Sequence, residues 1–128
     1  MDILAKVHKH YGTTILLLVL IGAILALAKG PKVAYQRVVA VLVDINVVLG
    51  LASWWVSGKA LSLLHPLLAL AAVGLLHASA KSDQSRKVAT CWLLAFAALL
   101  LAWMTNASWG PGFLKGVWMV SLRGGAPA

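Results

Sequence analysis

The chain has 128 residues, of which 62% are hydrophobic and only 11% are charged. A soluble domain is usually about 45–50% apolar and about 25% charged, so this composition indicates an integral membrane protein. The net charge of +8 would suggest nucleic acid in a soluble protein, but here the basic residues cluster between apolar runs, as in loops that touch anionic headgroups. We therefore expect the lipid bilayer, and no nucleic acid, as a partner. The single cysteine excludes an internal disulfide and a cysteine-rich metal site.

Four apolar runs follow one another, and each has about the 20 residues that a membrane-spanning helix needs. They cover roughly residues 11–28, 33–56, 61–80 and 88–105. The first run resembles the core of a signal peptide, but we expect it to be retained as a transmembrane helix. Short connections make consecutive helices antiparallel neighbours. The sequence therefore predicts an all-α, integral membrane, up-down-up-down four-helix bundle that forms a single domain over residues 1–128.

The C-terminal part carries a rough apolar stripe within roughly residues 113–122, and Lys115 lies off that stripe. A short amphipathic C-terminal segment at the membrane interface explains this pattern.

Basic residues in the short loops predict the orientation, because cytoplasmic loops are enriched in Lys and Arg. The loop on one side of the predicted membrane carries only Lys59. The two loops on the other side carry Lys29, Lys32, Arg37, Lys81, Arg86 and Lys87. We therefore expect both termini outside and the basic side in the cytoplasm, as in a bacterial inner-membrane protein.

The third run contains two of the four histidines, His65 and His77. An imidazole in hydrocarbon is costly unless it is paired, bound to a metal or directed into a polar cavity. In an antiparallel bundle, His65 shares the outer half with His8 and His10, whereas His77 lies about 18 Å away in the inner half. Two imidazoles at similar depth on diagonal or neighbouring helices are what a bis-histidine b-type haem requires.

Either His8 or His10 could supply the second imidazole. His8 shares a helical stripe with Gly12 and Val19, a face of small and apolar residues that allows close packing. His10 shares the opposite face with Lys6 and other polar residues, but it lies closer to the hydrocarbon. Both candidates therefore stay open.

Two short motifs resemble those of small transmembrane b-type cytochromes: Lys9-His10-Tyr11-Gly12 opens the first helix and His65-Pro66-Leu67-Leu68 opens the third. In that family, histidines near helix ends ligate haem in a four-helix core that passes electrons to or from quinones or soluble carriers. The resemblance implies haem b as cofactor, with His65 and either His8 or His10 on the iron. His77 lacks a histidine partner on the second or fourth run, so at most one intrachain bis-histidine haem is expected.

Other uses of these histidines remain open. A histidine near a helix end can serve as a polar anchor at the membrane interface. The His8/His10 pair can bind copper or zinc, although two ligands are too few for a closed site. A lone histidine can instead ligate the magnesium of a chlorophyll.

Asp44 lies near the middle of the second run, where a carboxylate costs about 2.5–3.5 kcal/mol on insertion scales. We expect it to face the bundle interior with a partner, either as a proton-relay or quinone-site group or as an acid that serves assembly. Asn46 points about 200° away around the helix, so the two residues do not form one site. We expect Asn46 to contact a second chain, because an amide alone in lipid is unfavourable.

These observations lead to the hypothesis of a small electron-transfer subunit with one haem near the outer face. The haem propionates would pair with Lys59, Lys6 or Lys9, and Trp54 or Trp55 would pack against the porphyrin edge. The main alternative is a cofactor-free accessory subunit that assembles with other membrane subunits or with itself. A third is an oligomeric proton-coupled transporter that uses Asp44.

Overall fold

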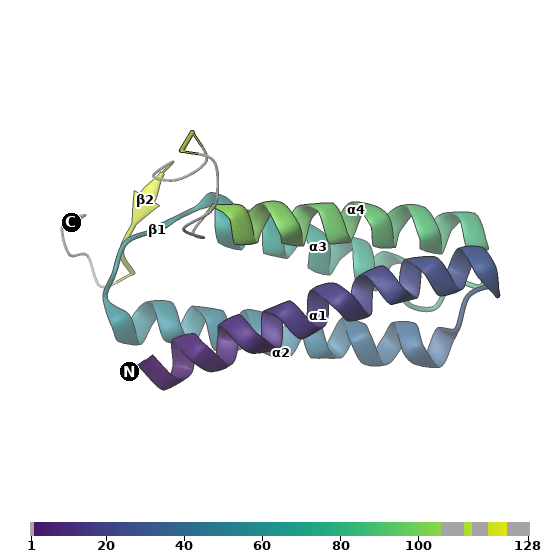
Figure 1. The fold of residues 1–128 in the computed structure, drawn as a ribbon, viewed down its shortest axis with the longest axis horizontal. Coiled ribbons are helices and arrows are strands. Elements are labelled where there is room, and N and C mark those ends of the chain that lie inside the picture. The colour runs from purple at the N-terminus through teal and green to yellow at the C-terminus, as the bar shows by residue number, and fades with distance from the viewer. Residues whose placement is uncertain (1, 106–111, 114–117, 123–128) are drawn as a thin grey trace.

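The computed structural model describes residues 2–105, 112–113 and 118–122. Within these residues the chain forms four helices and two short strands: α1 (Asp2–Ala28), α2 (Val33–Ser57), β1 (Leu61–Ser62), α3 (Leu64–Ser79), α4 (Ser85–Met104) and β2 (Met119–Val120). The prediction of a helical protein is therefore confirmed. Figure 1 shows the four helices side by side, with each helix running opposite to the one before it.

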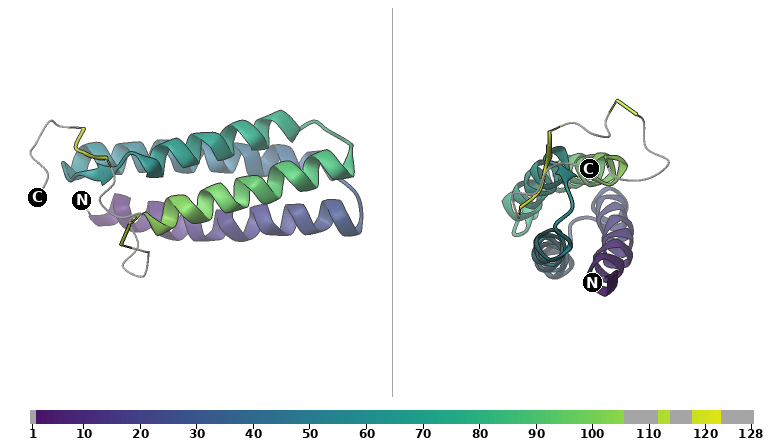
Figure 2. Two further views of the ribbon diagram at one scale, coloured as in Figure 1. Left: turned by 90° about the horizontal axis from the view of Figure 1, so that it is seen from above. Right: turned by 90° about the vertical axis from the view of Figure 1, so that its left-hand side faces the viewer.

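Two of the helices lie at opposite corners of the assembly. α1 packs against α2 and α4, and α3 packs against the same two neighbours. The end-on view in Figure 2 accordingly places α1 diagonally across from α3. Residues that point inward from α1 and α3 can therefore meet in the middle.

Three of the described helices, α1, α2 and α4, are long and apolar enough to cross a membrane. The shortest of them has 20 residues, which at 1.5 Å per residue spans about 30 Å, the thickness of a bilayer's hydrocarbon core. The first helix is longer than predicted because the polar residues before Tyr11 continue it back to Asp2. Gly30 and Gly58, which have positive φ angles of 89° and 66°, follow the ends of α1 and α2 close to the predicted positions.

The third helix is shorter than predicted. It has 16 residues, or about 24 Å, where the sequence suggested a span over residues 61–80. The first two residues of that run form β1, which pairs antiparallel with β2 through Leu61 opposite Val120 and Ser62 opposite Met119. The Ser62 hydroxyl then accepts a hydrogen bond from the Leu64 N–H, so the helix begins after the strand.

The same pairing changes the prediction for the C-terminal segment. Of its residues, Met119 and Val120 form one strand of this small sheet, whereas its position at the membrane interface stays a prediction. Residues 114–117, which carry part of the predicted stripe, lie outside the described residues.

Polar contacts hold the helices together at the end away from β1. Trp92 of α4 is fully buried, packs over Gly22 of α1 and donates its indole N–H to the Ser79 hydroxyl of α3 at 3.1 Å. The amide nitrogen of Gln36 on α2 donates to carbonyl groups at and just after the end of α3, those of Ser79, Ala80 and Ser82. These contacts fix the register of the helices and thus the level of the histidines at the other end.

Candidate functional site

His8 of α1 and His65 of α3 meet between the two diagonal helices. Their ring centroids are 5.9 Å apart and their planes make an angle of 78°. His65 lies in the first turn of α3 and His8 lies near the start of α1, so the antiparallel arrangement brings both to the end where the chain begins (Figure 1). Of the two N-terminal histidines that the sequence offered, the structure brings His8 to His65.

Both imidazoles are held by backbone carbonyl groups. The Nδ1 of His65 lies 2.7 Å from the carbonyl oxygen of Ala102 on α4. The Nδ1 of His8 lies 3.1 Å from both the backbone and the side-chain oxygen of Asn46 on α2. Because carbonyl oxygens only accept hydrogen bonds, each Nδ1 carries the proton and donates.

This tautomer leaves the lone pair of each neutral imidazole on Nε2. No donor among the described residues lies within hydrogen-bond distance of either Nε2. A histidine that ligates a metal has this arrangement, with one ring nitrogen on the metal and the other N–H donated to a carbonyl that fixes the ring. The two histidines therefore have the protonation and the anchoring of a ligand pair.

Two glycines, one on α1 and one on α2, make room for the His8–Asn46 contact between these helices. A Cβ atom at Gly50 would lie 2.7 Å from Cε1 of His8, so the imidazole occupies the space that a side chain at position 50 would fill. A Cβ atom at Gly12 would likewise lie 3.2 Å from the amide nitrogen of Asn46. Each helix thus places a polar residue over the glycine of the other: His8 of α1 over Gly50 of α2, and Asn46 of α2 over Gly12 of α1.

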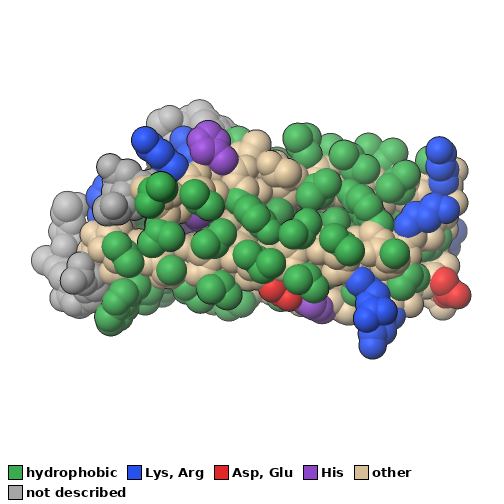
Figure 3. Space-filling model, turned by 90° about the horizontal axis from the view of Figure 1, so that it is seen from below, with side chains coloured by type: hydrophobic (Ala, Val, Ile, Leu, Met, Phe, Trp, Pro, Cys, Tyr) green, Lys and Arg blue, Asp and Glu red, His purple; other side chains and the backbone are tan. Residues whose placement is uncertain are grey.

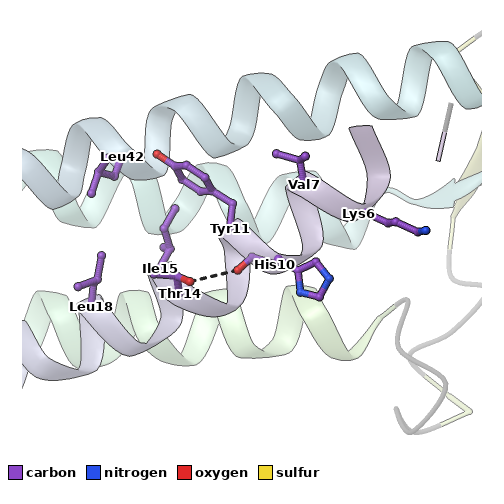
Figure 4. A pocket seen from close by; sticks show the side chains of 8 residues that line it. All are labelled: Lys6, Val7, His10, Tyr11, Thr14, Ile15, Leu18 and Leu42. Carbon is purple, nitrogen blue, oxygen red and sulfur yellow. Dashed lines mark hydrogen bonds between the residues drawn. The ribbon is translucent and has the colours of Figure 1, made fainter. Parts of the chain in front are cut away.

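His10 lies on another side of α1. It is exposed, and it lines a shallow groove with Lys6, Tyr11 and Leu42 among its walls. Figure 4 shows Tyr11 directed toward α2 and His10 on the opposite side of α1, while the carbonyl of His10 accepts a hydrogen bond from Thr14. The His-x-His spacing therefore does not converge on one point.

The lysine and tryptophan predicted to flank a haem lie at this end but outside the core. Lys59 is exposed, and Trp55 is 57% exposed. Of Trp54 and Trp55, Trp54 is the buried one. Its indole N–H donates to the carbonyl of Val120, and this hydrogen bond connects α2 to β2.

Asp44 and His77 form a second polar pair, on the flank of the assembly. The Asp44 carboxylate contacts Nε2 of His77 at 2.8 and 3.0 Å, and the two side chains remain 42% and 46% exposed. In Figure 3 an acidic and a histidine side chain lie together on a largely hydrophobic face. The expectation that Asp44 faces the interior was wrong. Asp44 directly follows the buried Val43, and a step of about 100° moves it to the edge of the α2–α3 seam.

Asn46 also differs from the prediction, because its partner His8 lies in the same chain. The sequence reasoning missed this role, and it missed Gly50 and the Ala102 carbonyl as parts of the site. A signal was present: His8/Gly12 and Asn46/Gly50 are both spaced by four residues, which places each pair on one helix face. Only the alignment of α1 with α2 shows that the two pairs interlock.

The two imidazoles lie edge to face, with their planes at 78°. When each metal–nitrogen bond is about 2 Å, the centroids of two opposed imidazoles lie roughly 6 Å apart, close to the observed 5.9 Å. No group of three His, Cys, Asp or Glu side chains converges on a metal position in the described part of the chain.

Comparisons of the chain with protein families, with characterised proteins and with solved structures found no match.

Proposed function

We propose that the protein is a small membrane-embedded electron-transfer subunit, similar to a b-type cytochrome, with His8 and His65 as the two axial ligands of one haem. The observation that carries the proposal is the His8–His65 pair itself. Two imidazoles from diagonal helices lie 5.9 Å apart, and each has its Nδ1–H donated to a carbonyl oxygen.

The surface supports a membrane location for an up-down-up-down bundle. Large apolar side chains are exposed along all four helices, including Leu17, Val48, Leu70 and Leu94 at 54–65% exposure. Figure 3 shows such side chains covering the flank between its two ends, while Lys and Arg side chains lie toward the ends. A water-soluble monomer rarely exposes a continuous apolar patch of this extent. The distribution of Lys and Arg favours both termini outside and the basic loops in the cytoplasm of a bacterial cell.

The chain's own residues would set the properties of the site. The Ala102 carbonyl and Asn46 orient the two imidazoles and increase their basicity, as outer-shell partners do. Exposed Lys59, Lys6 and Lys9 would offer ammonium groups to haem propionates at the same end. A bound haem supplies one-electron redox chemistry, whose potential depends on axial ligands, hydrogen bonds and burial. Quinones or soluble electron carriers are the corresponding exchange partners.

A cofactor-free accessory subunit is the second candidate, and the same contacts favour it. His8 and His65 connect α1 to α2 and α3 to α4 through hydrogen bonds, and their rings pack edge to face. Such a network can hold helices together without a ligand. This protein would then contribute its apolar flanks to a larger membrane complex.

The haem content of the purified chain separates the two candidates. The full chain is expressed with haem supplied and purified in detergent, and haem is measured per chain for wild type, His8→Ala and His10→Ala. We expect one haem per chain in wild type and in His10→Ala, which removes the same side chain two residues away, and loss of haem in His8→Ala. A colourless wild type that is folded by circular dichroism would overturn the haem proposal and favour the accessory subunit.

A further inference from the structure

A groove between α2 and α3 opens at the basic end of the molecule, away from the His8–His65 pair. It has a volume of about 250 Å³ and is lined by Arg37, Ala40, Val41, His77, Ala80 and Lys81. Arg37 and Lys81 are exposed, and no described carboxylate lies within ion-pair distance of either side chain. The groove therefore presents two positive charges over a wall of small apolar residues.

One acidic residue, Asp44, contacts a residue that lines the groove. The carboxylate of Asp44 contacts His77, which itself lines the groove. The Asp44 carboxylate is thus hydrogen-bonded to His77 and forms no ion pair with Arg37 or Lys81. Arg37 and Lys81 remain available to a phosphate group, with guanidinium and ammonium donors suited to its oxygens.

Beyond the basic end, exposed apolar residues form a stripe on each of the two helices, with the Asp44–His77 pair near the groove. On α2 the exposed residues Val41, Ile45 and Val48 follow Arg37 at helical spacing. On α3 the exposed residues Leu70 and Gly74 precede His77 and Lys81 at the same spacing. We call the strip of surface along these two stripes the trough. A basic groove that adjoins such an apolar strip has the polarity of a phospholipid, with a charged headgroup and apolar acyl chains.

We propose that this groove binds an anionic phospholipid, with its phosphate between Arg37 and Lys81 and an acyl chain along the α2–α3 seam. Basic pockets between helices on the cytoplasmic side of membrane proteins bind acidic headgroups in this way. The apolar continuation selects a lipid over free phosphate, because soluble phosphate would leave the trough uncovered. The site needs no haem, so its test is independent of the function proposed for the His8–His65 pair.

Native mass spectrometry of the detergent-solubilised full chain tests the headgroup contact. The chain is titrated with phosphatidylglycerol and with phosphatidylcholine of the same acyl chains. We expect tighter binding of phosphatidylglycerol, and we expect Arg37→Gln/Lys81→Gln to weaken it roughly 30-fold, about fivefold for each basic side chain. The matched control, Arg86→Gln/Lys87→Gln, removes the same charge from the same end of the molecule but outside the groove. Equal weakening by both double variants would overturn the proposal.

A second variant tests the trough. A Cβ atom at Gly74 meets nothing within 4 Å, so Gly74→Leu adds a side chain to the lipid-facing stripe without a clash inside the chain. We expect Gly74→Leu to weaken phosphatidylglycerol binding several-fold while the melting temperature does not fall, because Leu is a better helix former than Gly. Unchanged lipid binding in this variant contradicts an acyl chain in the trough. Competition by millimolar inorganic phosphate would identify an anion site instead and would also overturn the proposal.

Discussion

The two histidines of α3 are chemically identical but occupy opposite environments. His65 lies between diagonal helices, and its Nδ1 is bound by a carbonyl of α4. His77 lies twelve residues later on the flank, and its Nε2 is bound by the Asp44 carboxylate. Twelve residues rotate the direction of a side chain by about 120°, so the helix cannot point both rings to the same place. Helical phase, rather than residue type, therefore decides which histidine has a free Nε2 between helices.

The strongest contrast is expected between alanine variants of these two histidines. His65→Ala removes a proposed ligand and should lower haem affinity by more than about 100-fold, beyond the 10–100-fold typical of losing an outer-shell partner. His77→Ala should leave haem affinity unchanged. Equilibrium titration of the haem-free chain, followed by visible absorption, measures both. Similar losses of haem affinity in the two variants would contradict a haem site that uses His65 and not His77.

Two glycines offer a comparison based on packing alone. Gly50→Ala places a methyl group against the His8 ring and should destabilise the protein by about 1–3 kcal/mol, as overpacking does. Gly74→Ala enters open space and should stabilise α3 by up to about 1 kcal/mol, because Ala is the better helix former. Chemical denaturation in detergent, monitored by circular dichroism, compares them. Equal stability of Gly50→Ala and Gly74→Ala would contradict the close packing of His8 against Gly50.

A smaller effect is expected at Asn46. Asn46→Ala removes the side-chain oxygen beside His8 but keeps the backbone carbonyl, which lies at the same 3.1 Å distance. Haem affinity should therefore fall about tenfold, the lower end of the range for an outer-shell partner. The haem titration used for His65→Ala measures it. If Asn46→Ala lowered haem affinity as much as His65→Ala does, the Asn46 side chain, rather than its backbone carbonyl, would be the group that holds the His8 imidazole.

The smallest effect is expected at Asp44. Asp44→Asn weakens a half-exposed ion pair and should change stability by no more than about 1 kcal/mol, with haem affinity unchanged. Denaturation and haem titration measure both quantities. Proton flux in reconstituted vesicles that disappears in Asp44→Asn would instead favour the transporter hypothesis.

Local sequence signals predicted most of the helical framework. The glycines after α1 and α2 ended those helices where the apolar runs suggested, and the stripe of His8, Gly12 and Val19 pointed inward as its small residues indicated. The start of α3 could not be predicted in this way. Leu61 and Ser62 pair with residues nearly sixty positions later, and their hydropathy alone resembles that of a helix.

The candidate site was only partly predictable for a related reason. His65 stood out because it lies within an apolar run, but the choice between His8 and His10 required the packing of α1 against its neighbours. Asp44 was misplaced because the width of the buried face of α2 is set by α1 and α3, not by α2 itself. Such contacts depend on how helices align, and no periodicity within one helix contains that information.

The central claim is that His8 and His65 hold one haem iron together, and imidazole rescue tests it most directly. Visible spectra of haem-loaded wild type, His8→Gly and His65→Gly are recorded with and without added imidazole. We predict a six-coordinate bis-imidazole spectrum in wild type that imidazole does not change. Each glycine variant should lose this spectrum and regain it when imidazole fills the vacated position. A glycine variant that keeps the wild-type spectrum without imidazole would contradict the claim.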